Sequence, residues 1–325
     1  MKNVNTVCGP VRSDELGIVL PHEHIVFGFP GWNGDCTVGP FGTDTWVERI
    51  LAELERAKKA GVKTIVDATP NECARNPQFL KKISQLSGIN IICATGCYFE
   101  DFSCPSYWKN REFMGSSMFD ELHEMMITEI TEGIADTEIK PGVIKLATSS
   151  GRITDFERVL FEVAAKVHGE TGIPIITHTQ DATMGAEQAE LLVRSGVDPK
   201  KRQIGHMCDS LDLEYHERVL SYGVNDAFDR IGHNGLSGTP YITDVHETIY
   251  KLLEKGYEDQ IVLAHDCVIV EAGRDVYRDE AHEAMFDMIH MDTVGTITVP
   301  ALKEMGATDR QIDKMLISNP ARFFG

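Results

Sequence analysis

The chain has 325 residues, of which 42% are hydrophobic, so it can bury a large core and is not a disordered chain. Its 50 acidic residues against 31 basic ones give a formal net charge of −19, which argues against a basic surface for nucleic acid. No stretch reaches the roughly 18 apolar residues of a membrane span, and no signal peptide is visible. We therefore expect a soluble, cytoplasmic protein without nucleic-acid or membrane partners.

Short apolar segments alternate with longer amphipathic ones along the chain. The expected strands are residues 17–20, 63–68, 90–94, 142–146, 173–177, 203–205, 223–228 and 260–263. The expected helices include residues 45–60, 118–133, 154–168, 186–195, 213–221 and 243–254. This alternation is typical of parallel βα units.

Glycine follows four of these helices, at Gly61, Gly196, Gly223 and Gly256, where a left-handed residue turns the chain back toward the next strand. No linker or low-complexity segment divides the chain. The sequence therefore predicts the α/β class and a single (β/α)8 TIM barrel over residues 1–325, in preference to two smaller α/β domains.

His22 and His24 follow the first expected strand with one residue between them. Side chains at alternate positions of an extended segment point the same way, so the two imidazoles can bind one metal ion. Catalytic groups of such barrels lie at the carboxyl ends of the strands. The pair therefore predicts a metal site at the C-terminal mouth of the barrel.

Further candidate ligands accompany later strands. Lys145 lies within the fourth, while His178, His206 and Asp266 come directly after the fifth, sixth and eighth. A single histidine in such a place is usually structural, but four candidates after successive strands favour a metal cluster. His265 precedes Asp266 and points to the opposite face, which places it outside the site. The histidines in helical segments are expected to be solvated surface groups: His123, His168, His216, His246 and His282.

Lys145 is an unusual neighbour for a metal, because a buried ammonium loses its hydration and repels a cation. A desolvated, partly neutral amine can instead add carbon dioxide and become an anionic carbamate with two oxygens able to bridge two metals. The alternative is a lysine paired with a buried acid. With a carbamate, the nitrogen and oxygen donors suit two divalent ions such as zinc, cobalt or manganese.

The eight cysteines are scattered and contain no Cys-x-x-Cys pair. Reduced thiols are therefore favoured over a disulfide framework.

This order of residues resembles the amidohydrolase superfamily and, more closely, the phosphotriesterase family with its lactonase branch. The supporting segments are residues 20–24 (LPHEH), 61–67 (GVKTIVD), 175–179 (IITHT), 204–206 (IGH) and 317–324 (ISNPARFF). They span nearly the whole chain, so the resemblance is specific at the level of the family.

The resemblance implies a pair of divalent metal ions, zinc first with manganese, cobalt or iron as alternatives, and a carbamate on Lys145 formed from CO2. The inner metal would be held by His22, His24, Lys145 and Asp266, and the outer one by Lys145, His178 and His206. A hydroxide bridging the metals would attack the substrate. Asp266 would orient this hydroxide and take its proton.

Two residues favour the lactonase branch. Tyr98 stands where lactonase members carry a tyrosine over the metal pair, and Arg230 resembles the arginine of their Asp-Arg pair after strand seven. The resemblance gives the phenol a hydrogen bond to the lactone, while Arg230 would shuttle protons or hold Asp266 through Asp209. The expected function is lactone opening with promiscuous phosphotriesterase activity. The alternatives are a dedicated organophosphate phosphotriesterase and a non-catalytic metal- or ligand-binding barrel.

The segment after Asp266, up to about Gly295, is too long for an ordinary barrel loop and is expected to cover the substrate pocket. Its methionines and phenylalanine (Met285, Phe286, Met288 and Met291) suit an acyl chain. Its expected polar contacts with substrate come from Arg274, Tyr277 and Arg278. Since the two arginines suit an anionic group such as a sugar phosphate instead, both alternatives stay open. The resemblance also suggests a homodimer.

Asn225 and Asp226 depart from the family pattern, because strand seven of lactonase members usually carries apolar residues there. Alternation along the strand places Asp226 on the same inward face as Arg230. An unpaired carboxylate there would be costly, so either Asp226 has a partner or this strand is altered.

Overall fold

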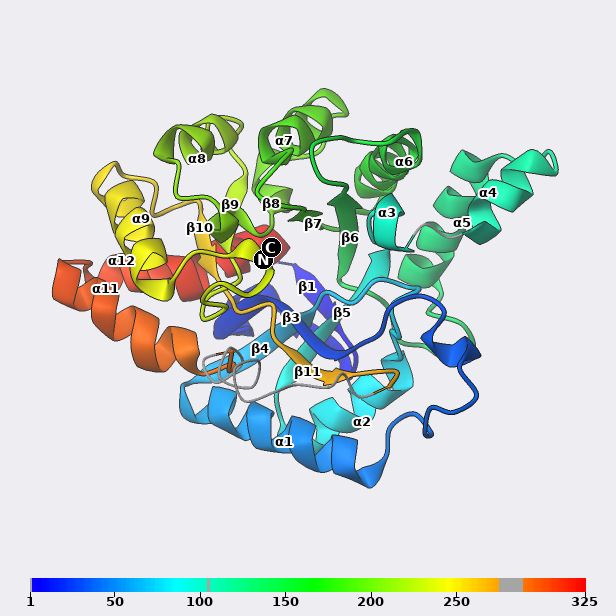
Figure 1. The fold of residues 1–325 in the computed structure, drawn as a ribbon, viewed down its shortest axis with the longest axis horizontal. Helices are drawn as coiled ribbons and strands as arrows, with labels where there is room; N and C mark the ends of the chain where they lie inside the picture. The colour runs from blue at the N-terminus through cyan, green and yellow to red at the C-terminus, as the bar shows by residue number, and fades with distance from the viewer. Residues whose placement is uncertain (1, 104–105, 275–288) are drawn as a thin grey trace.

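The computed structural model describes residues 2–103, 106–274 and 289–325. Nine parallel strands form one curled sheet in the order β10-β9-β8-β7-β6-β5-β4-β3-β11, with helices around its outside (Figure 1). The strands are β3 (Ile18–Phe27), β4 (Val62–Asp67), β5 (Asn90–Gly96), β6 (Val143–Thr148), β7 (Ile175–Thr179), β8 (Arg202–Ile204), β9 (Asn225–Phe228), β10 (Ile261–Leu263) and β11 (Val268–Glu271). The α/β class and the parallel sheet are confirmed.

The two end strands of this order, β10 and β11, follow one another in the chain. β10 pairs with β9, and β11 pairs with β3, where Val268 lies opposite His24. Between them, Asp266 N donates to His22 O at 3.1 Å and His24 N donates to Cys267 O at 2.9 Å. One continuous segment therefore contacts both β9 and β3, which brings the last predicted strand beside the first.

Most of the helices that connect the strands bury one face. Those that connect successive strands are α1 (Asp44–Lys59), α2 (Pro77–Ser87), α3 (Glu100–Ser103), α4 (Ser106–Phe113), α5 (Met118–Thr131), α6 (Asp155–Thr171), α7 (Gly185–Arg194), α8 (Leu213–Leu220) and α9 (Ile242–Glu254). The chain ends with α11 (Val299–Met305), α12 (Asp309–Asp313) and α13 (Asn319–Phe324). In α1, Ile50, Leu54 and Ala57 recur at helical spacing and are fully buried, whereas α4 has no buried residue.

Local signals define the ends of these helices. Thr154 and Glu157 form a capping box at the start of α6, in which each side chain accepts the other residue's backbone N–H. The four glycines expected after helices all have positive φ, between 73° and 88°: Gly61, Gly196, Gly223 and Gly256. The predicted left-handed turns are therefore confirmed.

The inside of the curled sheet is packed at the end opposite the predicted site. Val19, Val66, Val143 and Ile176, from four different strands, meet there in one buried cluster. Val4 joins them from an antiparallel hairpin of β1 (Asn3–Thr6) and β2 (Gly9–Arg12), which the sequence did not predict. This packed layer leaves the carboxyl ends of the strands as the open end of the sheet.

All eight predicted strands are present, but β3, β5, β6 and β7 continue beyond their expected ends. β3 continues to Phe27, so His22 and His24 lie within the strand rather than after it, and His178 likewise lies within β7. The extension of β3 depends on β11, which pairs with its second half. β11 was not predicted, because its segment was expected to be a loop.

Asp226 does not share an inward face with Arg230, so that expectation was wrong. His216 on α8 donates from Nδ1 to Asp226 Oδ2 at 2.7 Å, and the imidazole stacks on Phe228 with ring centroids 5.0 Å apart. The carboxylate therefore faces the helix layer, where it has a partner. β9 keeps its parallel pairing with both neighbours.

Three helical histidines are buried, which corrects the expectation that they are solvated. His168 donates to Ile173 O at 2.7 Å, and His246 lies 3.0 Å from Thr298 Oγ1. All three, His168, His216 and His246, lie on the buried faces of their helices. His123 is partly exposed beside Glu170, and His282 lies outside the described residues.

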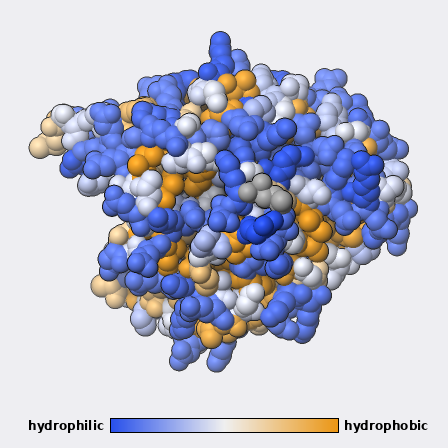
Figure 2. Space-filling model, turned by 180° about the vertical axis from the view of Figure 1, so that it is seen from behind, coloured by the Kyte–Doolittle hydropathy of each residue, from blue (hydrophilic) through white to orange (hydrophobic). Residues whose placement is uncertain are grey.

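Hydrophilic side chains cover most of the face that lies behind the view of Figure 1, and hydrophobic ones form smaller patches between them (Figure 2). Within the described ranges, no helix is both long and apolar enough to cross a membrane. Every cysteine that the structure describes is unpaired, and Cys104 lies outside those residues.

Candidate functional site

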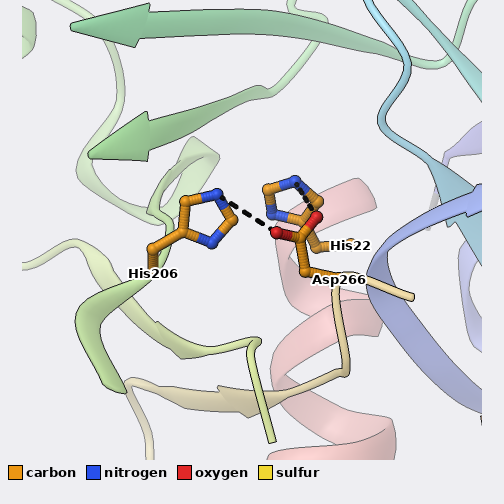
Figure 3. A group of neighbouring side chains, drawn as sticks. All are labelled: His22, His206 and Asp266. Carbon is orange, nitrogen blue, oxygen red and sulfur yellow. Dashed lines mark ion pairs between the residues drawn. The ribbon is translucent and has the colours of Figure 1, made fainter. Parts of the chain in front are cut away.

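The predicted metal ligands meet at the carboxyl ends of the strands. His22 and His24 lie on β3, Lys145 on β6 and His178 on β7. His206 follows β8, and Asp266 follows β10. The rings of His22 and His206 turn toward the carboxylate of Asp266 from two sides (Figure 3). One ligand atom from each of these three residues lies within 4.8 Å of the others.

Asp266 is central to this group. Its Oδ1 lies 3.1 Å from His24 Nε2 and 3.7 Å from His22 Nε2, and its Oδ2 lies 3.7 Å from His206 Nε2. Burial opposes ionisation of this carboxyl, but neighbouring charge, including that of the Arg230 guanidinium, outweighs burial and holds the pKa of Asp266 well below its usual range. The site therefore presents an anionic oxygen to three imidazoles.

Asp229 fixes two of the imidazoles from behind. Its Oδ2 accepts from His22 Nδ1 at 2.6 Å, and its Oδ1 accepts from the backbone N and the Nδ1 of His206 at 2.6 Å and 3.0 Å. Because Nδ1 carries the hydrogen in both rings, the lone pair of each Nε2 faces the interior of the site.

His24 is oriented in the same way by Thr69. The hydroxyl of Thr69 donates to Val26 O at 3.2 Å and therefore accepts from His24 Nδ1 at 2.8 Å. Asp67 holds this arrangement, since its carboxylate accepts from the backbone N of Ile25 and of Thr69. The Nε2 lone pair of His24 consequently faces Asp266.

His178 is turned around relative to the other three. Its Nε2 donates to Gln180 Oε1 at 2.8 Å, while the amide of Gln180 donates to Asp181 at 2.9 Å. The lone pair of His178 therefore lies on Nδ1, which is 2.7 Å from His206 Nε2.

Two pairs of atoms thus face each other without a hydrogen between them: His178 Nδ1 with His206 Nε2, and His24 Nε2 with Asp266 Oδ1. Such pairs repel unless a cation neutralises them. Protonation is disfavoured at the first pair, because burial lowers the pKa of both His178 and His206 well below the usual value. Imidazole nitrogens and a carboxylate are a donor set that fits borderline divalent metals.

Lys145 is buried beside these groups, with Nζ 2.7 Å from His22 Nε2. Burial lowers the pKa of this amine to about 8, although the charges of Asp266 and Asp229 oppose the shift. A substantial fraction of the Lys145 amine can therefore be neutral. The neutral amine is the form that adds carbon dioxide. An anion at this position fits a metal cluster, whereas an ammonium does not.

Arg230 connects the cluster to a second carboxylate. Its Nε donates to Asp266 Oδ2 at 3.0 Å, and its Nη1 donates to Asp209 Oδ2 at 2.6 Å. Burial opposes the guanidinium charge, but Asp209 and Asp266 outweigh burial and raise the pKa of Arg230. The guanidinium thus fixes the carboxylate of Asp266 through two charge-assisted contacts.

Tyr98 lies at the edge of the cluster, after β5. Its ring centroid is 5.0 Å from that of His178 and 5.9 Å from that of Phe27, and its backbone N donates to Glu72 at 2.7 Å. Burial raises the pKa of the phenol, which therefore keeps its hydrogen and can donate it.

A cleft of about 960 Å³ opens over the cluster. Its base includes the site residues His24, Lys145, His178, Asp266, Tyr98 and Arg230, and its apolar wall includes Phe27, Phe29, Trp46, Leu236 and Ile289. This size suits a small-molecule substrate.

Of the residues expected from the long segment after Asp266, the structure describes Arg274 and Met291, and neither lines the cleft. Arg274 is exposed and forms an ion pair with Asp35 at 2.5 Å, outside the lining of the cleft. Met291 is buried in the core. The remaining predicted residues of this segment lie outside the described residues: Tyr277, Arg278, Met285, Phe286 and Met288.

The sequence did not reveal the residues that orient the ligands. Asp229 was noted only as the neighbour of Arg230, although its place directly after β9 was a usable signal. Thr69 and Gln180 carry no such signal, because their role depends on contacts that form only in the folded chain.

A curled parallel sheet with four oriented imidazoles, a carboxylate and a buried lysine at its carboxyl edge defines a metal-dependent hydrolase. A model of the phosphotriesterase family matches residues 2–324. The chain therefore belongs to the phosphotriesterase family.

Individual relatives agree with this assignment. The chain is 32% identical to a phosphotriesterase homology protein of Mycobacterium tuberculosis, covering 100% of this chain and 98% of the relative. It is 31% identical to an aryldialkylphosphatase of Saccharolobus solfataricus, with 97% and 96% covered. A solved variant of a phosphotriesterase-like lactonase of Deinococcus radiodurans is 43% identical, with a TM-score of 0.96 and coverage of 99% and 100%.

Proposed function

We propose that the protein is a binuclear metal-dependent hydrolase that opens lactones and hydrolyses phosphotriesters more slowly. The observation that carries this proposal is the set of nitrogen and oxygen atoms that face each other without a hydrogen, at His178 and His206 and again at His24 and Asp266. Two separate pairs of this kind support two cation positions.

In the proposed site, His22, His24, Lys145 and Asp266 hold one divalent ion, and Lys145, His178 and His206 hold the other. Lys145 would serve both sites as a carbamate formed with CO2, and zinc is the first candidate metal, with manganese, cobalt or iron as alternatives. When bound, the two ions lower the pKa of water toward neutrality and polarise the oxygen of the substrate.

The protein's own residues then orient the substrate and move a proton. Asp266 accepts the proton of the attacking water on its carboxylate, which Arg230 holds through Oδ2. Arg230 and Asp209 keep this carboxylate in place while it changes charge. Tyr98 donates its phenolic hydrogen to the oxygen of the lactone.

We propose lactones rather than phosphotriesters as the better substrates because of Tyr98 and Arg230. The similarity to the Deinococcus radiodurans lactonase supports the same order. The similarity to the Saccharolobus solfataricus aryldialkylphosphatase supports the slower second activity. Arg274, Tyr277 and Arg278 stay proposed substrate contacts, which would favour an anionic lactone.

A substrate panel tests this function. The metal-loaded protein is incubated with acyl-homoserine, aliphatic and phosphorylated sugar lactones and with a phosphotriester, and the Asp266→Asn variant serves as the inactive control. We expect the highest kcat/KM with a lactone. A higher kcat/KM with the phosphotriester would favour a dedicated phosphotriesterase, and no turnover by protein that holds two ions would favour a binding barrel.

The proposal includes a single closed (β/α)8 barrel over residues 1–325, which the continuous segment from β10 to β11 supports. It also includes a homodimer, which sedimentation of the metal-loaded protein would test.

A further inference from the structure

Glu23 lies between the two metal-binding histidines of β3 and points away from them. Its side chain is fully buried, and its carboxylate accepts hydrogen bonds from three donors. Oε1 accepts from the backbone N of His265 at 3.0 Å and from His265 Nδ1 at 2.7 Å, while Oε2 accepts from the backbone N of Cys267 at 2.9 Å. The carboxylate thus binds the amides on both sides of Asp266.

Asp266 has a backbone conformation that needs this support. Its φ is 51°, in the left-handed region that residues other than glycine rarely occupy. Its own amide donates to His22 O at 3.1 Å, and Cys267 O accepts from His24 N at 2.9 Å. The segment that carries Asp266 is therefore fixed by main-chain bonds to β3 and by both oxygens of Glu23.

The side-chain partner of Glu23 is the imidazole of His265. His265 Nε2 accepts from the backbone N of Val294 at 3.0 Å, so its hydrogen is on the Nδ1 that faces Glu23. No lysine or arginine forms an ion pair with Glu23 in the described ranges. Burying a carboxylate without a lysine or arginine partner destabilises the fold. Glu23 therefore points to a role that an apolar side chain could not fill.

We propose that Glu23 is the positioning residue of Asp266, and that it aims the Asp266 carboxylate at the imidazoles by holding the amides of His265 and Cys267. The inference rests on the proposed function, because that function gives Asp266 its role. An amide side chain cannot replace Glu23, since one of its two polar ends is a donor and would face a backbone N–H.

The test compares Glu23→Gln with Glu157→Gln. Glu157 is a matched control because it is also fully buried and accepts the backbone N–H groups of Ser149, Glu100 and Thr154 at 2.9–3.0 Å. It contacts none of the proposed ligands among the described residues. Both substitutions are expected to lower the Tm by a similar amount.

Only Glu23→Gln is expected to displace Asp266. We expect kcat to fall roughly tenfold to hundredfold with little change in KM, and metal to be lost faster to a chelator. Hydrogen exchange of the amides of residues 265–267 should also become faster. Equal losses of kcat in the two variants would overturn the proposal.

The exchange measurement needs no substrate, so it separates the two ideas. If the wild type hydrolysed neither a lactone nor a phosphotriester, the proposed function would fail. If hydrogen exchange at residues 265–267 were unchanged in Glu23→Gln, the proposed role of Glu23 would be wrong. If Glu23→Gln does not fold, Glu23→Asp keeps the charge but moves it away from one amide. A smaller loss of kcat is then expected, and full kcat would refute the inference.

Discussion

Asp229 Oδ2 accepts a hydrogen bond from His22 Nδ1 at 2.6 Å, although 207 residues separate the two in sequence. The other oxygen of the same carboxylate accepts from His206. One buried side chain therefore sets the tautomer of two imidazoles that lie far apart in the sequence.

Replacing Asp229 by asparagine should weaken metal binding roughly 10- to 100-fold. The amide keeps one acceptor oxygen and places an NH2 group against one of the imidazole N–H groups, so one ring has to turn or change its tautomer. Competition with a chromogenic chelator measures the metal affinity of each variant.

Asp226→Asn is the matched control for this substitution. Asp226 is a fully buried aspartate of β9, the strand that Asp229 directly follows, and it also binds an imidazole, that of His216, but it faces α8. The Asp226→Asn substitution should lower the Tm and leave metal affinity unchanged. A similar loss of affinity in both variants would mean that Asp229 acts through general stability.

Replacing Lys145 by alanine should remove the bridging anion and abolish hydrolysis. A small added carboxylate such as acetate is expected to restore part of the activity, because it can occupy the space and supply the missing oxygens. The rate is measured against acetate concentration with a lactone substrate. Full activity without acetate would refute a carbamate at this position.

Lys201 provides a control of similar character. It is also buried, burial lowers the pKa of its amine to about 8, and it donates to Phe323 O at 2.9 Å, near the chain terminus. Lys201→Ala is expected to cost stability and to keep both metal content and activity, with no response to acetate.

The grouping of the proposed metal ligands could be predicted because their signals are local. His22 and His24 alternate along a strand, and His206 and Asp266 follow runs of apolar residues, so their placement needs only the barrel and the direction of its strands. Lys145 stood out as a charge inside an apolar strand.

The parts that could not be predicted depend on contacts between distant segments. The bonds of Glu23 reach 242 and 244 residues along the chain, and the length of β3 depends on pairing with β11. Asp226 was assigned to the wrong face because alternation was counted through Arg230, which lies beyond the end of β9 at Phe228.

Tyr98→Phe should reduce lactone hydrolysis more than phosphotriester hydrolysis. The phenol lies beside His178, and its hydrogen is available to the ring oxygen or carbonyl of a lactone. We expect a fall of roughly tenfold in kcat/KM for lactones, which corresponds to the loss of one useful hydrogen bond. Both substrates are assayed with the same metal-loaded sample.

Tyr215→Phe controls for the removal of a buried hydroxyl, since the Tyr215 OH accepts from Gly185 N at 2.9 Å outside the cleft. It should change neither rate. Equal losses for lactone and phosphotriester in Tyr98→Phe would argue against a role specific to lactones.

His216 should make stability depend on pH above 6.5, the ordinary pKa of histidine. Burial lowers its pKa, but Asp226 and the carbonyl of Ser210, 3.0 Å from Nε2, outweigh burial and raise the pKa above the ordinary value of 6.5. Because the folded pKa is the higher one, the stabilisation is complete below pH 6.5 and is lost as pH rises through the folded pKa. His216→Gln should therefore cost most at mildly acidic pH, roughly 2 kcal/mol.

Urea unfolding of the wild type and of His216→Gln across this pH range measures the difference in the free energy of unfolding. His168→Gln is the control, because the buried ring of His168 has backbone partners at both nitrogens: it donates to Ile173 O and accepts from Asp198 N at 3.3 Å. The cost of His168→Gln should stay constant as pH rises above neutrality, while the cost of His216→Gln shrinks. A constant cost for His216→Gln would show that its ring carries no charge beside Asp226.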